Sequence, residues 1–201
     1  YNSAPNANGG AVYNKGVSST TSIRRTRFDN NSAPMGHGGA LYAASSSEIA
    51  IGHSAFEMNS AEIGGAIHIS SPANTVVIIS ETSFNENSAS YVDLGTPQGG
   101  GAISNNGTLT ITRSTLTNNS APDGSGGAIS NHQIAHIVNS TLTHNSSSQG
   151  GAIRTSDGAV LSVSYSTIVS NSTSPGRGAG IDSGDSSSAQ IKIKNSIVAN
   201  S

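Results

Sequence analysis

The chain has 201 residues, of which 33% are hydrophobic, 4% aromatic and 10% charged, and its formal net charge is −2. This charge argues against nucleic acid or an anionic membrane as the main partner, because both require a basic surface. The chain has no cysteine, which excludes disulfide frameworks and thiolate metal sites. The longest purely aliphatic run, residues 76–79, is far too short for a transmembrane segment, so we expect none in this chain.

One repeated unit fills the chain, and its clearest copy covers residues 100–121. It contains paired glycines, a small residue, an aliphatic residue, a polar turn, an alternating apolar run and an asparagine. The small residue recurs every 24 to 36 residues, at Ala11, Ala40, Ala66, Ala102, Ala128, Ala152 and Gly180. The asparagine recurs every 26 to 32 residues, at Asn2, Asn31, Asn59, Asn87, Asn119, Asn145, Asn171 and Asn200. Two independent markers with one period predict stacked coils of a β-solenoid.

Each coil is expected to contain three short strands, taken here in chain order. The first strand carries one aliphatic residue per coil: Val12, Leu41, Ile67, Ile103, Ile129, Ile153 and Ile181. The second carries apolar pairs two residues apart, such as Ile49/Ile51, Val77/Ile79, Leu109/Ile111 and Leu161/Val163. The third carries Phe28, Phe56, Phe84, Leu116, Leu142, Ile168 and Ile197. Since parallel crossovers are right-handed in nearly all cases, the pattern predicts an all-β, right-handed parallel β-helix of about seven coils.

Three polar features of the repeat have a structural explanation. A hydroxyl residue lies two positions before each of the first six third-strand anchors, and we expect it to face inward with that anchor: Thr26, Ser54, Thr82, Ser114, Ser140 and Ser166. The asparagines should stack from coil to coil and hydrogen-bond to one another or to the backbone of the turn. The paired glycines should permit positive φ or a close approach between coils at a sharp corner.

The tetrapeptide Gly-Gly-Ala-(Ile/Leu/Val), alternating with Phe-x-x-Asn, resembles the repeats of chlamydial polymorphic outer membrane proteins and of related right-handed β-helix bacterial surface proteins. The tetrapeptide occurs at 9–12, 38–41, 64–67, 100–103, 126–129 and 150–153, and Phe-x-x-Asn begins at Phe28, Phe56 and Phe84. Later coils replace the phenylalanine, and 178–181 scrambles the tetrapeptide. The resemblance implies a secreted or cell-surface protein, often adhesive. Because the chain starts and stops within a repeat, we expect a single domain over 1–201 that is a fragment or processed part of a longer chain.

Two sets of residues are candidates for binding. The outward column after the first strand contains Tyr13, Tyr42 and His68, followed by Ser104, Ser130, Arg154 and Asp182. Stacked aromatic rings beside polar groups could hold a sugar ring or a partner surface, and the alternative is a featureless exposed face. The longest insertion, residues 90–99, supplies Tyr91, Asp93 and Leu94, because insertions in solenoids form loops on one face, which is often the binding face.

Catalytic and metal sites are not indicated. The eleven carboxylates do not converge on the coil template, although Asp93 and Asp123 lie in loops of successive coils and Asp29 and Glu57 stack on neighbouring coils. Paired acid/base catalysis would require a shared cleft around the scissile bond. The histidines show no ligand spacing shared by several coils, so we expect no metal and no cofactor.

Two functions from different classes remain open. The first is a non-catalytic extracellular or cell-surface rod, acting as an adhesin, a structural spacer or a filament subunit. The second is a polysaccharide lyase or glycoside hydrolase on the same scaffold. Both ends of the chain lie at the same phase of the coil and show no polar cap, so the partner could be a second copy stacked head to tail. A host or cell-surface glycan or protein is the other candidate partner.

Overall fold

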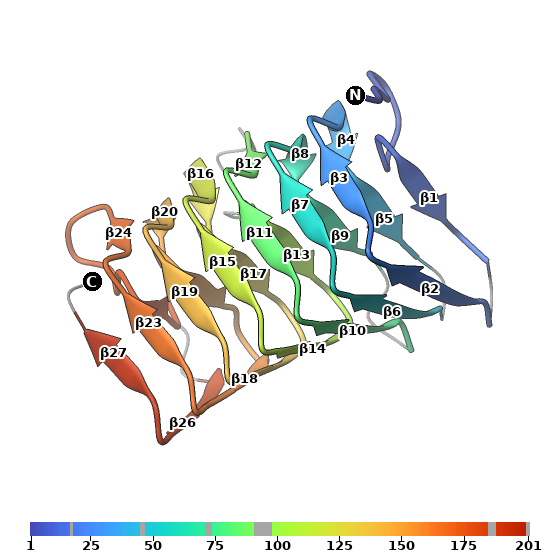
Figure 1. The fold of residues 1–201 in the computed structure, drawn as a ribbon. Helices are drawn as coiled ribbons and strands as arrows, with labels where there is room; N and C mark the ends of the chain where they lie inside the picture. Colours follow the sequence, from blue (N-terminus) through green and yellow to red (C-terminus); the bar gives the residue numbers. More distant parts are fainter. Residues whose placement is uncertain (17, 45–46, 71–73, 91–97, 185–187, 200–201) are drawn as a thin grey trace.

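The computed structural model describes residues 1–16, 18–44, 47–70, 74–90, 98–184 and 188–199. The chain winds into a single solenoid in which strands from successive coils lie side by side (Figure 1). In these residues every strand pairing is parallel and there is no helix. The described strands form six coils of four strands and a seventh of three. The predicted parallel β-solenoid is therefore confirmed, but the prediction of three strands per coil is wrong.

The first two strands of each coil build sheets 1 and 2. Sheet 1 contains β1 (Val12–Asn14), β5 (Leu41–Ala43), β9 (Ile67–Ile69), β13 (Ile103–Asn105), β17 (Ile129–Asn131), β21 (Ile153–Thr155) and β25 (Ile181–Asp182). Sheet 2 contains β2 (Thr20–Arg24), β6 (Glu48–Gly52), β10 (Val76–Ser80), β14 (Thr108–Thr112), β18 (Ile134–Val138), β22 (Val160–Ser164) and β26 (Gln190–Lys194).

The last two strands of each coil build sheets 3 and 4. Sheet 3 contains β3 (Arg27–Asp29), β7 (Ala55–Glu57), β11 (Ser83–Asn85), β15 (Thr115–Thr117), β19 (Thr141–Thr143), β23 (Thr167–Val169) and β27 (Ile197–Ala199). Sheet 4 contains β4 (Ser32–His37), β8 (Ser60–Ile63), β12 (Ser88–Ala89), β16 (Ser120–Ser125), β20 (Ser146–Gln149) and β24 (Ser172–Thr173). Sheet 4 escaped prediction because its strands begin with serine followed by alanine, serine or threonine, which give no alternating apolar signal.

The predicted apolar columns form the core. Leu41, Ile67 and Ile103 stack in register inside sheet 1, and the apolar pairs of sheet 2 are buried beside them. The Phe28–Phe56 and Phe56–Phe84 rings stack with centroids 4.6 and 4.8 Å apart.

The prediction that Ile197 belongs to the inward column of the third strand is wrong. Val198 pairs with Ile168, whereas Ile197 pairs with Thr167 and is 59% exposed. The corner residue Ser196, two positions before Val198, sets the register here.

The glycine corner between sheets 4 and 1 has the two properties predicted for it. Gly38 has a φ of +68°, a conformation that disfavours other residues. A Cβ atom on the next residue, Gly39, would lie only 2.2 Å from the carbonyl oxygen of Gly65 in the following coil. The first glycine therefore makes the turn, and the second lets the coils approach each other.

Two ladders of polar side chains tie the coils together along the edges of sheet 3. In the asparagine ladder, Asn87 Nδ2 donates to Asn119 Oδ1 (2.9 Å) and to the carbonyl of Phe56 (3.0 Å). In the hydroxyl ladder, Ser114 Oγ accepts from the backbone N–H of Thr82 (3.1 Å) and donates to the carbonyl of Thr112 (2.8 Å). The predicted structural roles of both sets are confirmed.

The two ends of the solenoid differ in polarity. At the N-terminal end, the inward positions of β1 and β2 hold Asn14 and Thr21, and Asn14 Nδ2 donates to Thr21 Oγ1 (2.9 Å). At the C-terminal end, the inward positions of β26 hold Ile191, which corresponds to Thr21, and Ile193, and these are 38% and 47% exposed. The expectation that neither end carries a polar cap is therefore wrong for the N-terminal end.

Candidate binding surfaces

The predicted aromatic column on the outer face of sheet 1 forms a continuous stack. Tyr13 and Tyr42 stack with centroids 5.1 Å apart, and Tyr42 stacks on His68 at 5.5 Å. The registers of β1, β5 and β9 place the three rings in one line. We call Tyr13, Tyr42 and His68 the aromatic column. Its exposure falls steeply, from 51% for Tyr13 to 4% for His68.

His68 is buried because the end of a sheet 4 strand lies against it. The ring of His37, at the end of β4, is 4.7 Å from the ring of His68. Burial, together with the charges of His37 and His132, lowers the pKa of His68 to about 3. His68 Nδ1 has no hydrogen-bond partner in the described part of the chain. His68 is therefore a neutral, packed side chain rather than an exposed ligand-binding group.

The rest of the outward column on sheet 1 is largely covered in the same way. Ser104 and Ser130 are fully buried, and Asp182 is only 7% exposed. Ser125, at the end of β16, places its hydroxyl 3.2 Å from that of Ser130. The alternative of a flat exposed face is therefore wrong for this stretch, because the sheet 4 strands that sequence reasoning missed extend over it.

A serine–histidine contact on this surface has the residue types of a nucleophile and its base. Ser130 Oγ lies 3.0 Å from His132 Nε2, and His132 Nδ1 lies 2.9 Å from Ser156 Oγ. A catalytic serine must reach its substrate, and the base is oriented by a third group. Ser130 is fully buried, and the third group is a hydroxyl that carries no charge. The contact therefore serves packing.

The predicted contact residues of the long insertion, Tyr91, Asp93 and Leu94, lie outside the described residues. Asp123, the proposed partner of Asp93, lies exposed on β16.

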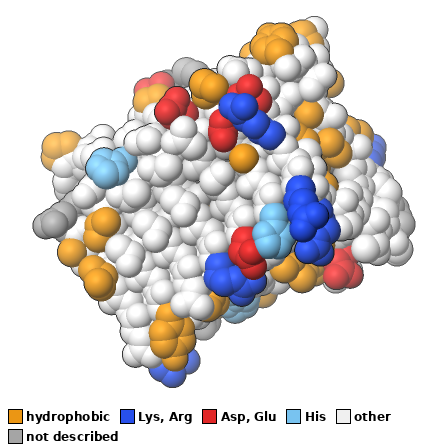
Figure 2. Space-filling view, in the orientation of Figure 1, with side chains coloured by type: hydrophobic (Ala, Val, Ile, Leu, Met, Phe, Trp, Pro, Cys, Tyr) orange, Lys and Arg blue, Asp and Glu red, His pale blue; other side chains and the backbone are white. Residues whose placement is uncertain are grey.

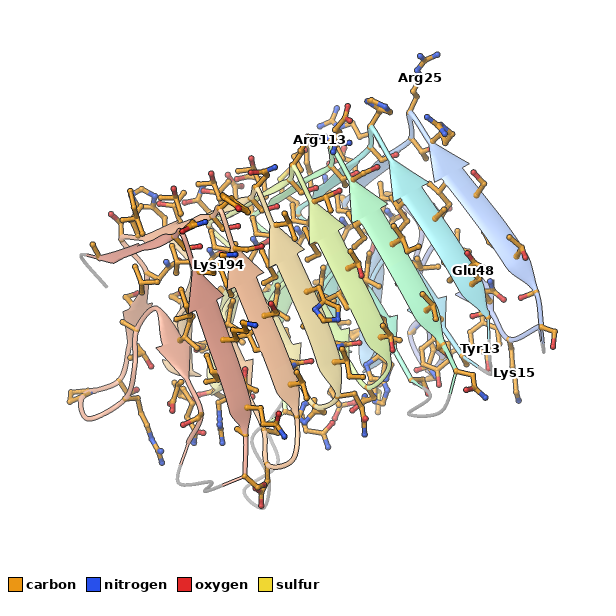
Figure 3. All side chains as sticks on the ribbon, turned by 90° about the horizontal axis from the view of Figure 1, so that it is seen from below. Tyr13, Lys15, Arg25, Glu48, Arg113 and Lys194 are labelled. Atoms are coloured by element: carbon orange, nitrogen blue, oxygen red, sulfur yellow. The ribbon has the colours of Figure 1, made fainter. Side chains whose placement is uncertain are left out.

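A second surface, which sequence reasoning did not identify, lies at the corner between sheets 2 and 3. Four successive coils place Arg25, His53, Glu81 and Arg113 there, each with φ between 46° and 51°. We call these four residues the corner row. Each one directly precedes a member of the hydroxyl ladder, so the inward hydroxyl holds the corner and the preceding side chain is exposed. Figure 3 shows Arg25 and Arg113 projecting from the same edge of the solenoid.

The centre of the corner row is a chain of ion pairs. Arg113 Nε and Nη2 both donate to Glu81 Oε1, at 3.1 and 2.7 Å. His53 Nδ1 lies 2.9 Å from Glu81 Oε2. The hydrogen bond from Arg113 lowers the pKa of Glu81 and outweighs the opposing effect of desolvation, and the charges of His53, Arg113 and Arg24 also lower it. Glu81 is therefore held as a carboxylate.

A second charged group lies on the outer face of sheet 3. Arg27 Nη2 and Nε donate to Glu57 Oε2 at 2.6 and 3.1 Å, and Arg27 Nη2 lies 3.6 Å from Asp29. The hydrogen bond to Glu57 raises the pKa of Arg27. The expected stacking of Asp29 and Glu57 on neighbouring coils is confirmed by the pairing of β3 with β7.

A shallow groove of about 670 Å³ lies along the corner row, and Arg27 contributes to its lining. The small side chains of Ala55 and Ser83 also line the groove. Figure 2 shows charged side chains in two groups on this face, with uncharged side chains between them. The sequence could have located the corner row only by its position, one residue before each hydroxyl of the ladder. The left-handed backbone of the structure is what shows that this residue is exposed at the corner.

No three histidine, aspartate or glutamate side chains of the described residues lie close enough to hold a metal ion. The same part of the chain contains no helix that could span a membrane.

Comparison with known families gives one match. The family described as "Right handed beta helix region" matches residues 10–200, which is nearly the whole chain. This match supplies the handedness expected from the sequence. Neither the curated proteins nor the solved structures gave a match.

Proposed function

The chain belongs to the right-handed β-helix family, and from this premise we propose that it is a non-catalytic rod, secreted or at a bacterial cell surface, that acts as an adhesin or spacer. The resemblance to repeats of bacterial surface proteins supports this location. The proposal concerns how the chain presents its outer side chains.

The observation that carries the proposal is the contrast between a fixed interior and a variable exterior. The asparagine ladder runs from Asn2 to Asn171 with side-chain bonds of 2.8 to 3.0 Å between successive coils. Such bonding, repeated at about 4.8 Å per coil, holds outer side chains in fixed register without local flexibility. A rigid rod of this kind suits a protein that binds a partner on its outer surface or holds other parts at a fixed distance.

The chemistry of the groove also favours binding over catalysis. A glycosidase generally needs one carboxylic acid that can donate a proton and a second carboxylate across the scissile bond. Glu81, the carboxylate that lines the groove, is held ionised between Arg113 and His53. It is therefore poorly suited to act as a general acid.

The experiment that tests the proposal measures turnover and binding on the same purified chain. We expect no release of unsaturated or reducing sugar from pectin, alginate or sulfated glycans, together with saturable binding to at least one surface polymer. Sugar release that disappears in Asp93→Asn or Asp123→Asn would establish the lyase or hydrolase alternative and overturn the proposal. Sedimentation velocity over a range of concentrations tests the proposed head-to-tail stacking, since a chain that stays monomeric would contradict it.

A further inference from the structure

We propose that the groove along the corner row binds the carboxylate or sulfate groups of an acidic glycan, with Arg25 and Arg113 as its main contacts. This inference rests on the proposed function, because it names the ligand that the rod would hold.

Positive charge is concentrated at this corner. The chain has six arginines, and four of them lie close to the corner between sheets 2 and 3 in the first four coils: Arg24 at the end of β2, Arg25 and Arg113 on the corner, and Arg27 at the start of β3. Three carboxylates, Asp29, Glu57 and Glu81, lie beside them. The arginines therefore exceed the carboxylates by one, counted with His53 neutral.

The carboxylates do not satisfy all of the arginines. In the described part of the chain, Arg24 and Arg25 have no carboxylate within 4.0 Å. Arg25 lines the groove and is exposed. An anion in the groove would therefore meet an arginine that is not already bound to a carboxylate.

The arginines that are paired are also positioned for a ligand. Arg113 uses Nε and Nη2 on Glu81, and Arg27 uses the same two atoms on Glu57. A guanidinium has five N–H groups, and among the described residues no acceptor bonds to Nη1 of either arginine, which leaves that edge for a second acceptor. Because the carboxylates already fix these side chains, binding loses less conformational entropy.

The remaining lining of the groove favours a sugar chain over a peptide. Small or hydroxylated side chains line part of the groove: Ala55 and Ser83, which are half-buried, and Thr115, which is exposed. The same column continues along sheet 3 as Thr141 and Thr167, in register with Thr115. From Ser83 to Thr167 this column presents one hydroxyl side chain per coil, which matches the hydroxyl groups of a linear polysaccharide laid along the solenoid. A peptide would instead require apolar pockets for its anchoring side chains.

The test uses three polymers and two exposed positions. The probes are polygalacturonate fragments, dextran sulfate and neutral dextran, which separate a carboxylate from a sulfate ligand and both from the sugar backbone. We expect binding to at least one charged polymer, none to neutral dextran, and affinity that falls with increasing salt. Arg25→Asn should weaken binding about tenfold. Asparagine suits this corner because Asn139 and Asn195 adopt the same left-handed conformation in later coils.

The matched control is Lys192→Asn, which removes one positive charge from exposed β26 on another face. Lys192→Asn should leave binding nearly unchanged. Arg113→Lys keeps the positive charge but removes the paired N–H groups of the guanidinium, so it should weaken binding. Equal losses in Arg25→Asn and Lys192→Asn, or equal binding to neutral dextran, would overturn the groove assignment. Absence of binding to all three polymers would also overturn it while leaving the rod proposal standing. Degradation of a charged polymer would instead overturn the rod proposal itself.

Discussion

The aromatic column and the corner row both consist of outward-facing residues, yet their chemistry is opposite. Each contains a histidine. His68 is 96% buried and its pKa is lowered to about 3, whereas His53 is exposed and contacts Glu81. The difference comes from neighbouring elements, since the ends of sheet 4 strands cover sheet 1 but leave the corner row free. Periodicity decides which way a side chain points, and packing decides whether it meets solvent.

Asn119→Ala should have the largest effect, because it removes an internal support that both surfaces share. Asn119 Oδ1 accepts from the backbone N–H and Nδ2 of Asn87, and its Nδ2 donates to Asn145 Oδ1 and the carbonyl of Phe84. Loss of these four buried bonds should lower the free energy of unfolding by about 3 to 5 kcal/mol. Denaturant unfolding of the variant and the unaltered chain measures this difference in free energy. Ser114→Ala, which loses two bonds in the same coil, should cost about half as much, and equal losses would contradict the ranking of the two ladders.

The aromatic column should make stability depend on pH. The pKa of His68 is about 3 in the fold and 6.5 ordinarily, so the unfolded chain binds the extra proton between these values. The free energy of unfolding should therefore be greatest above pH 6.5 and fall by about 1.4 kcal/mol per pH unit below it. His68→Phe should reduce this slope. A smaller slope should remain, because burial also lowers the pKa values of His37 and His132.

The control for this prediction is His53→Gln, which changes the exposed histidine of the corner row. It leaves His37, His68 and His132 in place, so the pH slope that these buried histidines produce should persist. An unfolding free energy that stays flat from pH 7 to pH 4.5 in the unaltered chain would show that His68 is not held neutral.

Two buried serines in neighbouring strands of sheet 1 should respond differently to removal of the hydroxyl. Ser104 Oγ has no hydrogen-bond partner in the described part of the chain, so Ser104→Ala should be neutral or stabilising by up to about 1 kcal/mol. Ser130 Oγ contacts Ser125 and His132, so Ser130→Ala should destabilise by about 1 kcal/mol. Thermal and urea unfolding compare the pair directly. A clear loss of stability in Ser104→Ala would reveal a partner for that hydroxyl.

The smallest effect on stability is expected for the ion pairs of the corner row. Glu81→Gln removes the carboxylate that holds Arg113 and His53, but all three side chains are exposed. Exposed ion pairs contribute little because water and salt screen them. We expect no resolvable change in the thermal midpoint at physiological salt. A large drop in the thermal midpoint would mean that the corner row stabilises the fold, as the buried part of the aromatic column does.

The sequence alone determined the parallel solenoid, the inward columns, the glycine corners and both ladders. These features recur from coil to coil, and a repeated position must satisfy the same packing and hydrogen bonds each time. The sequence also placed Tyr13, Tyr42 and His68 in one outward line, because the side-chain period of a strand is two.

Only the tertiary structure decided which outward residues are exposed. Sheet 4 has no apolar signal, so its coverage of His68 and Ser130 could not be predicted. The corner row depends on a left-handed backbone at Arg25, His53, Glu81 and Arg113, residue types that give no sign of that conformation in a sequence. His53, Glu81 and Arg113 meet because positions 28 and 32 residues apart in the chain stack directly on one another, and that proximity belongs to the folded solenoid.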